Sequence, residues 1–320
     1  MKILYTPTLS VPALGAEQRA GILEAAGPAA VLVEARDLAH QRAEVADADV
    51  LFGRVPPDVF ACQRRLRYYH ALGAGVDSIL TPELVGSDVI LASEKGQVGV
   101  HLAEHAFALL LGLTRGLHTA LRDPDYRHRE PIRREQRELY EQTMGIVGFG
   151  GTGREVARRA LGFGMQVLAV DVEAVAPEAG VPAVWKPDRL PELLGASDVV
   201  VVALPLTKAT RHLFTRDLFR QMRPGAVLIN VTRGEIVYGP DLLAALDEGL
   251  IWGAGLDVTD PEPLPPGHRL WTHPRVIVTP HTAGGSPRRA ERAVAVFSEN
   301  LRRLRTGRPL LALIDKRQGY

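Results

Sequence analysis

The sequence predicts an α/β fold made of two Rossmann-like or flavodoxin-like, doubly wound parallel-sheet domains, one inserted into the other. Short apolar runs alternate with helical patterns along all 320 residues, which is typical of parallel sheets covered by helices on both faces. A glycine-rich strand–turn–helix–strand unit spans residues 145–171. Such a unit usually opens its domain, yet about 145 residues precede this one.

The first part of the chain predicts a sheet of about five strands. A helical pattern at 17–26 ends before Gly27, a residue type that often stops a helix. A helix at 100–113 is too apolar for a surface position, so we expect it to be buried between domains or subunits. The five apolar runs that we interpret as strands are 2–5, 30–33, 50–52, 68–72 and 89–92.

The unit at 145–171 contains a turn suited to phosphate binding. Gly148, Gly150 and Gly153 have G-x-G-x-x-G spacing between an apolar run and a helical pattern. These glycines let the backbone approach a pyrophosphate, whose charge the N–H groups at the helix start stabilise. Asp171 ends the next apolar run, 18 residues after Gly153, where a carboxylate binds ribose hydroxyls and repels a 2′-phosphate. The sequence therefore predicts an NAD site that prefers NADH over NADPH.

The alternation of strands and helices continues to the end of the chain. Strands are expected at 198–203, 226–230, 254–258 and 276–279, and helices at 242–246 and 287–304. We therefore expect a substrate-binding domain of residues 1–97 plus 287–320, and an NAD-binding domain of residues 98–286. The two crossings between them allow a hinge, and a cleft between α/β domains favours a small ligand.

Composition excludes several function classes. A net charge of +1 gives no overall field for nucleic acid or an anionic membrane. Cys62 is the only cysteine, which excludes an internal disulfide framework, provides no metal cluster and suits a reducing cytoplasm. The N-terminus reads as a strand rather than a signal peptide, and no apolar run is long enough to span a membrane. We expect a cytoplasmic protein that binds a small molecule and no metal.

Residues 115–141 differ in composition from the rest of the chain. They are rich in arginine, but interleaved glutamates argue against a nucleic-acid surface and favour a solvated arm or a subunit contact. Just before them, His101 and His105 flank Glu104 near the start of the apolar helix. We interpret these histidines as helix-packing or interdomain contacts rather than metal ligands.

Three polar residues follow strands downstream of the glycine turn. Arg233 comes after 226–230, Glu262 after 254–258, and His281 after 276–279. Because ligands in an open α/β sheet lie beyond the carboxyl ends of the strands, we expect all three near the nicotinamide. Arginine offers a planar fork for a carboxylate or carbonyl, and histidine exchanges a proton with an alkoxide near neutral pH. A carboxylate on the other ring nitrogen fixes the histidine tautomer.

In the glycine turn and in the segments that carry Arg233, Glu262 and His281, the chain resembles the D-isomer-specific 2-hydroxyacid dehydrogenase family, in particular its glyoxylate/hydroxypyruvate reductase-like members. The resemblance implies that Arg233 orients the substrate carboxylate and carbonyl, that His281 is the acid/base, and that Glu262 is its partner. It also implies hydride transfer between nicotinamide C4 and C2 of a small D-2-hydroxyacid or 2-oxoacid such as glyoxylate, hydroxypyruvate or pyruvate. A homodimer formed through about residues 100–140 is implied as well. The segments that carry the resemblance are 145–171, 204–207, 230–234, 253–265 and 279–285.

The same resemblance implies further contacts. Backbone N–H groups of Ala74 and Gly75 would hold the substrate carboxylate, and Arg54 is a candidate second substrate contact. Trp271 would either cover the active site or pack in the core. Asp257 would approach the nicotinamide carboxamide or influence the pH dependence, or else cap a helix or turn. The expected cofactor contacts are Gly148, Gly150, Gly151, Thr152, Gly153, Asp171, Pro205, Thr232, Asp257 and Gly284.

Two positions depart from the family pattern. Residues 93–96 read Ser-Glu-Lys-Gly where Asn-Thr-Pro-Gly is usual, and residue 151 is glycine where arginine is common. Two alternatives stay open. Formate dehydrogenases share the fold but have glutamine where this chain has Glu262. An NAD(H)-sensing, corepressor-like binding protein of the same fold would bind the cofactor without catalysis, although retention of the arginine, glutamate and histidine argues against lost activity.

Overall fold

The computed structural model describes all 320 residues, which divide into two compact units. Unit 1 comprises Met1–Val98 and Gly285–Tyr320, and unit 2 comprises Gly99–Gly284. The chain therefore leaves unit 1, builds unit 2 without interruption, and returns to finish unit 1. Both units have parallel sheets, which confirms the predicted α/β class.

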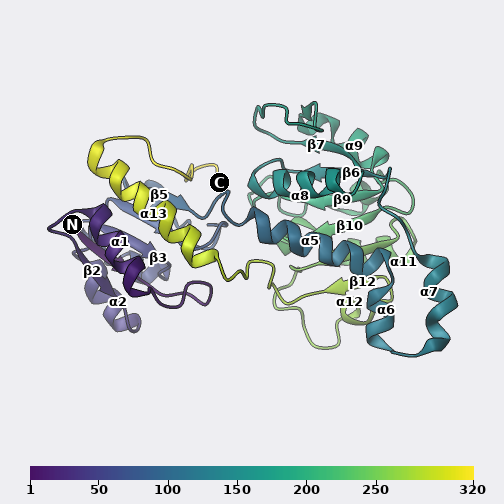
Figure 1. The fold of residues 1–320 in the computed structure, drawn as a ribbon, viewed down its shortest axis with the longest axis horizontal. Coiled ribbons are helices and arrows are strands. Elements are labelled where there is room, and N and C mark those ends of the chain that lie inside the picture. The colour runs from purple at the N-terminus through teal and green to yellow at the C-terminus, as the bar shows by residue number, and fades with distance from the viewer. The chain divides into compact units, whose positions relative to one another are not determined.

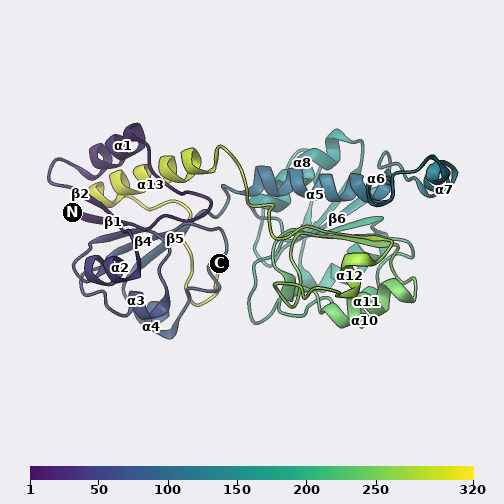
Figure 2. The ribbon, with the colours of Figure 1, turned by 90° about the horizontal axis from the view of Figure 1, so that it is seen from below.

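Unit 1 contains a five-stranded sheet in the order β2-β1-β3-β4-β5, the flavodoxin-like order. Helices α1 and α13 pack together on one face, and α2, α3 and α4 cover the other (Figures 1 and 2). Alternation along β1 explains this arrangement, since Ile3 and Tyr5 pack beneath α1 and α13 while Leu4 faces the opposite cluster. The strands are β1 (Lys2–Tyr5), β2 (Val31–Glu34), β3 (Val50–Gly53), β4 (Tyr68–Ala71) and β5 (Ile90–Ser93). The helices are α1 (Ala16–Ala26), α2 (Leu38–Val45), α3 (Pro57–Phe60), α4 (Pro82–Gly86) and α13 (Arg289–Thr306).

Unit 2 contains a seven-stranded sheet in the order β12-β11-β10-β9-β6-β7-β8. This is the Rossmann order with one added strand, and it reverses between β6 and β9. Helices α5 and α8 cover one face, and α9, α10 and α11 cover the other (Figure 2). The strands are β6 (Thr143–Val147), β7 (Gln166–Val170), β8 (Val184–Trp185), β9 (Val199–Val202), β10 (Val227–Asn230), β11 (Gly253–Leu256) and β12 (Val276–Val278). The helices are α5 (Gly99–Thr114), α6 (Leu117–Arg122), α7 (Arg129–Glu135), α8 (Gly151–Gly162), α9 (Leu190–Ala196), α10 (Arg216–Phe219), α11 (Gly239–Asp247) and α12 (Arg269–Thr272), with 3₁₀ turns η1 (Tyr126–His128), η2 (Pro187–Arg189) and η3 (Gly234–Ile236).

The apolar helix α5 is buried as predicted, but its partners correct the sequence interpretation. It packs against α8 and against strands β10, β11 and β12 of its own unit. A Cβ added at Gly99 would lie 2.5 Å from the backbone oxygen of Gly151, so the starts of α5 and α8 approach as only glycine allows. Contacts inside unit 2 therefore account for the apolar character that we assigned to a domain or subunit boundary.

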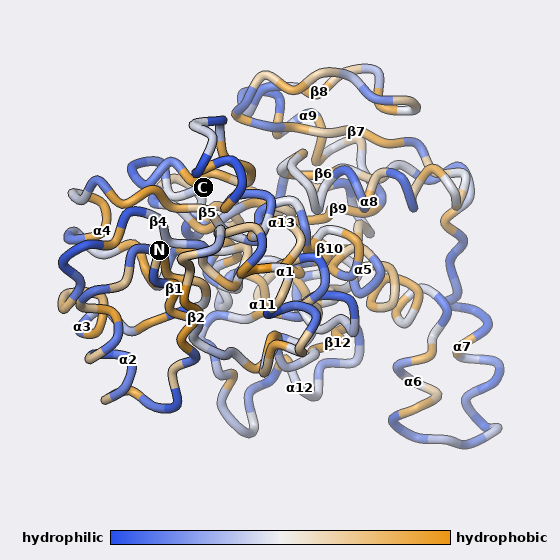
Figure 3. Tube along the Cα trace, turned by 60° about the vertical axis from the view of Figure 1, so that its left-hand side comes forward, coloured by the Kyte–Doolittle hydropathy of each residue, from blue (hydrophilic) through white to orange (hydrophobic).

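The arginine-rich stretch at 115–141 forms α6, η1 and α7, and most of its residues are exposed. Figure 3 shows α7 mostly hydrophilic and α5 mostly hydrophobic. Arg122 donates hydrogen bonds to the backbone oxygens of His273 (2.9 Å) and Val276 (2.7 Å), which fasten α6 to the start of β12. Leu121 and Tyr126 are 82% and 93% exposed. No helix of the chain combines the length and apolarity needed to cross a membrane.

Candidate active site

The glycine turn after β6 has the geometry expected for a pyrophosphate site. Gly148 has φ +98°, and a Cβ there would lie 2.7 Å from the backbone oxygen of Ala203. A Cβ at Gly153 would lie 2.2 Å from the backbone oxygen of Gly148, so this glycine lets α8 pack closely on the turn. A Cβ at Gly150 would meet nothing within 4 Å, so open space adjoins the turn at this glycine. Gly151 and Thr152 begin α8, whose first N–H groups are suited to an anion.

Asp171 follows β7 and lies against this turn. Its Oδ2 accepts a hydrogen bond from the backbone N–H of Phe149 (2.6 Å), and its Oδ1 accepts from that of Glu173 (2.8 Å). A carboxylate has about four acceptor positions, so two stay available for hydroxyl donors. Two cations are close to the same segment. Arg154 has its guanidinium 5.2 Å from the Phe149 ring centroid, and Lys186 Nζ donates to the backbone oxygen of Val172 (2.7 Å).

The buried side-chain amide of Asn230 holds the turn after β10 in place. Asn230 is fully buried, donates from Nδ2 to the backbone oxygen of Arg233 (2.8 Å), and accepts from the backbone N–H of Thr232 (3.1 Å). A Cβ at Gly234 would lie 1.9 Å from the backbone oxygen of Thr259. Only glycine therefore allows the loop carrying Arg233 to touch the loop that follows β11. Arg233 itself is half-buried, and its Nη1 donates to the backbone oxygen of Thr232 (2.8 Å).

His281 and Glu262 form a direct hydrogen bond. The distance between His281 Nδ1 and Glu262 Oε1 is 2.5 Å, and the two side chains are 46% and 40% exposed. Because a carboxylate only accepts, Nδ1 carries the shared hydrogen and Nε2 is the ring nitrogen left to exchange a proton. The backbone of His281 is left-handed, with φ +52°. The structure thus unites the histidine and the glutamate that the sequence selects.

Asp257 organises the loop that carries His281. Its backbone oxygen accepts from the backbone N–H of His281 (2.8 Å). Its carboxylate accepts from the backbone N–H groups of Thr282 (2.9 Å) and Ala283 (2.8 Å) and from Thr279 Oγ1 (2.6 Å). Burial opposes ionisation of this carboxyl, but hydrogen bonding with His105, together with the hydrogen bonds above, outweighs burial and holds its pKa below the ordinary value. Asp257 therefore makes the contacts of a loop cap, while its approach to the nicotinamide stays a prediction.

The sequence predicts only helix-packing or interdomain contacts for His105, whereas the structure gives it a specific polar partner. It lies on α5, and its Nε2 is 2.8 Å from Thr279 Oγ1 and 3.3 Å from Asp257 Oδ1. The signal in the sequence was a histidine on a strongly apolar helix, because a polar group in such a place needs a partner. In the structure its side chain is indeed mostly buried. What the sequence could not supply was the partner, because Thr279 lies 174 residues further along the chain.

The glycine turn, Asp171 and the loops of Arg233, Glu262 and His281 lie within a segment that matches a known family. Residues 107–283 match the family model described as D-isomer specific 2-hydroxyacid dehydrogenase, NAD binding domain. The chain belongs to the D-isomer-specific 2-hydroxyacid dehydrogenase family. It is therefore an oxidoreductase of 2-hydroxyacids, and unit 2 contains its NAD(P)-binding domain.

Relatives of the chain are similar over most of its length. Glyoxylate/hydroxypyruvate reductase A from Photorhabdus laumondii is 33% identical over 88% of this chain and 90% of that protein. Glyoxylate reductase from Pyrococcus furiosus is 33% identical over 85% and 84% of the two chains. Among solved structures, an NADPH-dependent glyoxylate/hydroxypyruvate reductase from Sinorhizobium meliloti, in complex with NADP and sulfate, is 30% identical, covers 100% of both chains and has a TM-score of 0.81.

In unit 1 of this dehydrogenase, the structure brings the expected substrate residues together. Arg54 follows β3, and its Nη2 donates to the backbone oxygen of Gly75 (2.9 Å) and to Ser78 Oγ (3.2 Å). The backbone oxygen of Ala74 accepts from Ser93 Oγ (3.2 Å). Nε of Arg54 is buried without a hydrogen-bond partner. Arg54 is therefore held over the loop that contains Ala74 and Gly75.

The structure also shows the positions of Pro205, Gly284 and Trp271. Pro205 is exposed in the loop after β9, where its backbone oxygen accepts from Thr210 Oγ1 (2.7 Å). Gly284 is the last residue of unit 2. Trp271 lies on α12 at 36% exposure and donates from Nε1 to the backbone oxygen of Pro265 (3.1 Å). The core-packing alternative for Trp271 is therefore wrong.

The segment at 93–96, which departs from the family pattern, contributes Glu94 to a buried ion pair with Arg289. Glu94 is 1% exposed, and both its oxygens accept from Arg289, with Oε1 3.0 Å from Nε and Oε2 2.5 Å from Nη2. Arg289 Nη1 also donates to Ser10 Oγ (2.7 Å). These residues all belong to unit 1, so the departure fastens its two chain segments to each other.

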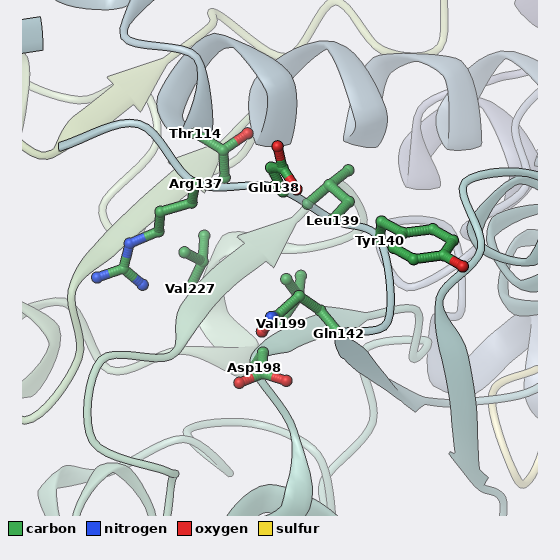
Figure 4. A pocket seen from close by; sticks show the side chains of 9 residues that line it. All are labelled: Thr114, Arg137, Glu138, Leu139, Tyr140, Gln142, Asp198, Val199 and Val227. Atoms are coloured by element: carbon green, nitrogen blue, oxygen red, sulfur yellow. The ribbon is translucent and has the colours of Figure 1, made fainter. Parts of the chain in front are cut away.

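A pocket of about 330 Å³ lies at the opposite edge of the unit 2 sheet (Figure 4). Gln142, Asp198 and Val227 line it at the amino ends of β6, β9 and β10, with Arg137 beside them. Two of its charged groups have protein partners, because Asp198 accepts from Arg223 Nη1 (2.7 Å) and Arg137 donates to the backbone oxygen of Gly225 (2.6 Å). The expected chemistry lies at the carboxyl ends of the strands, so we assign the active site there.

Proposed function

We propose that this enzyme reduces small 2-oxoacids of the glyoxylate, hydroxypyruvate or pyruvate type to D-2-hydroxyacids, with NADH as the preferred reductant. The observation that carries this proposal is the 2.5 Å hydrogen bond between His281 Nδ1 and Glu262 Oε1, which leaves the opposite ring nitrogen for proton exchange. The names of the relatives support the substrate class.

In the proposed reaction, an arginine orients the substrate, a histidine donates a proton and a glutamate supports the histidine. A bound nicotinamide would supply the hydride that reaches C2 of the oxoacid. Arg233 would orient the substrate carboxylate and carbonyl with its planar guanidinium. His281 would give the proton on Nε2 to the carbonyl oxygen, so that a hydroxyl and a neutral imidazole result. Glu262 would keep the hydrogen on Nδ1 and stabilise the protonated ring before transfer.

Substrate selection is assigned to unit 1. Ala74 and Gly75 would hold the substrate carboxylate through backbone N–H groups, and Arg54 would add a cationic contact. The unpartnered Nε of Arg54 supports this role, because a buried donor without an acceptor is costly and an anion would satisfy it.

Cofactor choice is assigned to Asp171. Its carboxylate would bind the ribose hydroxyls and repel a 2′-phosphate, which favours NADH. Arg154 and Lys186 lie nearby, and the Sinorhizobium meliloti relative is NADPH-dependent. We expect wild-type kcat/KM to be higher with NADH, and Asp171→Ala to shift the ratio toward NADPH by about tenfold, the effect of removing one repulsive charge. Equal ratios in both proteins would overturn the assignment.

The direct test follows NADH oxidation with a panel of 2-oxoacids and analyses the product by chiral chromatography. We expect turnover of glyoxylate and hydroxypyruvate, and D-glycerate from the latter. If the protein binds NADH by fluorescence but reduces no 2-oxoacid, the NAD(H)-sensing, corepressor-like alternative replaces the proposal.

We further propose a cytoplasmic homodimer formed through about residues 100–140. The exposed apolar side chains of Leu117, Leu121 and Tyr126 in this stretch support a protein contact. Sedimentation velocity at micromolar concentration tests the dimer, and a single monomeric boundary would contradict it.

A further inference from the structure

The backbone conformation of His281 requires support from its surroundings. Its φ of +52° is a left-handed conformation that is unfavourable for a non-glycine residue. Asp257 provides the immediate support, because its backbone oxygen and both carboxylate oxygens accept from the N–H groups of residues 281, 282 and 283. The position of the His281 ring therefore depends on the position of the Asp257 carboxylate.

The direction of the next hydrogen bonds follows from donor counting. The hydroxyl of Thr279 has one hydrogen, and the 2.6 Å contact with the acceptor-only carboxylate of Asp257 uses it. Thr279 Oγ1 must then accept from His105 Nε2, at 2.8 Å. The chain of donors thus runs from the His105 N–H to the Thr279 hydroxyl and on to the Asp257 carboxylate.

The helix that carries His105 also adjoins the glycine turn. The first residue of α5, Gly99, packs against Gly151 at the start of α8, which is the helix that follows the turn. His105 lies within two turns of Gly99 on the same helix. One rigid helix therefore contacts both the cofactor turn and, through Thr279, the loop of His281.

We propose that His105 and Thr279 are positioning residues, which act through Asp257 to hold His281 where its Nε2 meets the substrate. This inference rests on the proposed function. Neither residue touches the reacting atoms, so their loss should slow the proton-transfer step and leave cofactor and substrate binding nearly unchanged. A purely structural role would instead lower stability without a specific effect on kcat.

The test compares variants that differ by one hydrogen-bonding group. Thr279→Val and His105→Leu remove the hydroxyl and the N–H donor, whereas Thr279→Ser and His105→Gln retain them. We expect the first two to lower kcat about tenfold with KM for glyoxylate and Kd for NADH changed less than about twofold, as loss of one net hydrogen bond implies. The second two should recover most of the activity. Thr114→Val is the matched control, because it removes a buried threonine hydroxyl at the end of α5, bonded to the backbone oxygen of Leu110 (2.9 Å).

Unchanged kcat in Thr279→Val, or no recovery in Thr279→Ser, overturns the role of Thr279. A kcat loss in Thr114→Val as large as in Thr279→Val also overturns it, because the effect would then be general. If Thr279→Val does not fold, the His105 pair decides the matter by the same criteria.

A second readout separates this inference from the proposed function. The chain has ten histidines, and the His281 Cε1–H NMR signal is assigned as the one that disappears in His281→Gln. At one fixed pH, we expect this signal to shift in Thr279→Val and to stay in place in Thr279→Ser and Thr114→Val. If no 2-oxoacid is reduced, the proposed function fails and the NMR result still decides the positioning role. If turnover is normal and the signal does not move in Thr279→Val, the positioning role fails alone.

Discussion

Two histidines in this chain illustrate opposite uses of the same side chain. In unit 1, His70 is fully buried, contacts the Tyr68 hydroxyl through Nδ1 (2.7 Å), and has no partner at Nε2. In unit 2, His281 contacts the Glu262 carboxylate, and 46% of its side chain is exposed. Burial lowers the pKa of His70 to about 3. A histidine becomes useful for proton exchange when one ring nitrogen has a carboxylate partner and the other is accessible.

The surroundings of the two rings match these uses. His70 lies among Phe52 and Phe297, with ring centroids 5.6 and 5.5 Å away in edge-on arrangements. Asn300 completes the buried group by donating to the Tyr68 hydroxyl (2.9 Å). This group ties α13 to β4 and has no route to solvent. We therefore expect variants at His281 to affect activity and variants at His70 to affect stability.

The largest expected effect is on catalysis by His281→Gln. Loss of the proposed general acid should lower kcat by about 10²–10⁴-fold while NADH still binds. Initial rates with glyoxylate and NADH fluorescence titration measure the two quantities. His40→Gln is the control, because His40 also lies near a carboxylate, Glu44 (3.6 Å), but on α2 of unit 1. Equal activity of the two variants would remove the distinction that we draw for His281.

A smaller effect is expected for Glu262→Gln. The amide oxygen still accepts from His281 Nδ1, but the negative charge that stabilises the protonated ring is lost. We expect kcat to fall about tenfold, corresponding to one hydrogen bond to a charged group. A loss equal to that of His281→Gln would indicate that Glu262 transfers the proton itself.

The smallest effect concerns the stability of unit 1 at low pH. Between pH 6.5 and about 3, His70 binds a proton in the unfolded chain but not in the folded one. Its contribution to stability is therefore complete above pH 6.5 and decreases as pH falls, by roughly 1 kcal/mol per pH unit. His70→Phe should reduce this slope in urea unfolding experiments.

The positions of the tryptophans allow the two units to be followed separately. Trp185, Trp252 and Trp271 all belong to unit 2. Circular dichroism reports both units, whereas tryptophan fluorescence reports unit 2. We expect the His70→Phe difference in the circular dichroism curve only. A difference in the fluorescence curve as well would show that the units do not unfold independently.

The sequence predicts the main strands within two residues because these strands are short apolar runs bounded by turns. It also predicts the glycine turn, and it places Arg233, Glu262 and His281 in loops that follow strands of the sheet. Strand β8 is missed because its two residues carry too little pattern. The contacts of His105 and of Glu94 are missed for another reason. Their partners lie 174 and 195 residues away, and only the folded chain identifies them.

The ion pair between Glu94 and Arg289 can form only late in synthesis, because unit 2 lies between these two residues in the sequence. Unit 1 has its first 98 residues made before unit 2, and its remaining residues made after it. Until α13 emerges, Phe52 lacks the Phe297 ring that stacks on it at a centroid distance of 4.1 Å, and Glu94 lacks its arginine. One face of the nascent sheet therefore has only α1 to cover it while the whole cofactor domain is translated. For this chain, the ribosome completes the dehydrogenase domain that binds the dinucleotide before the domain that began first can close its core.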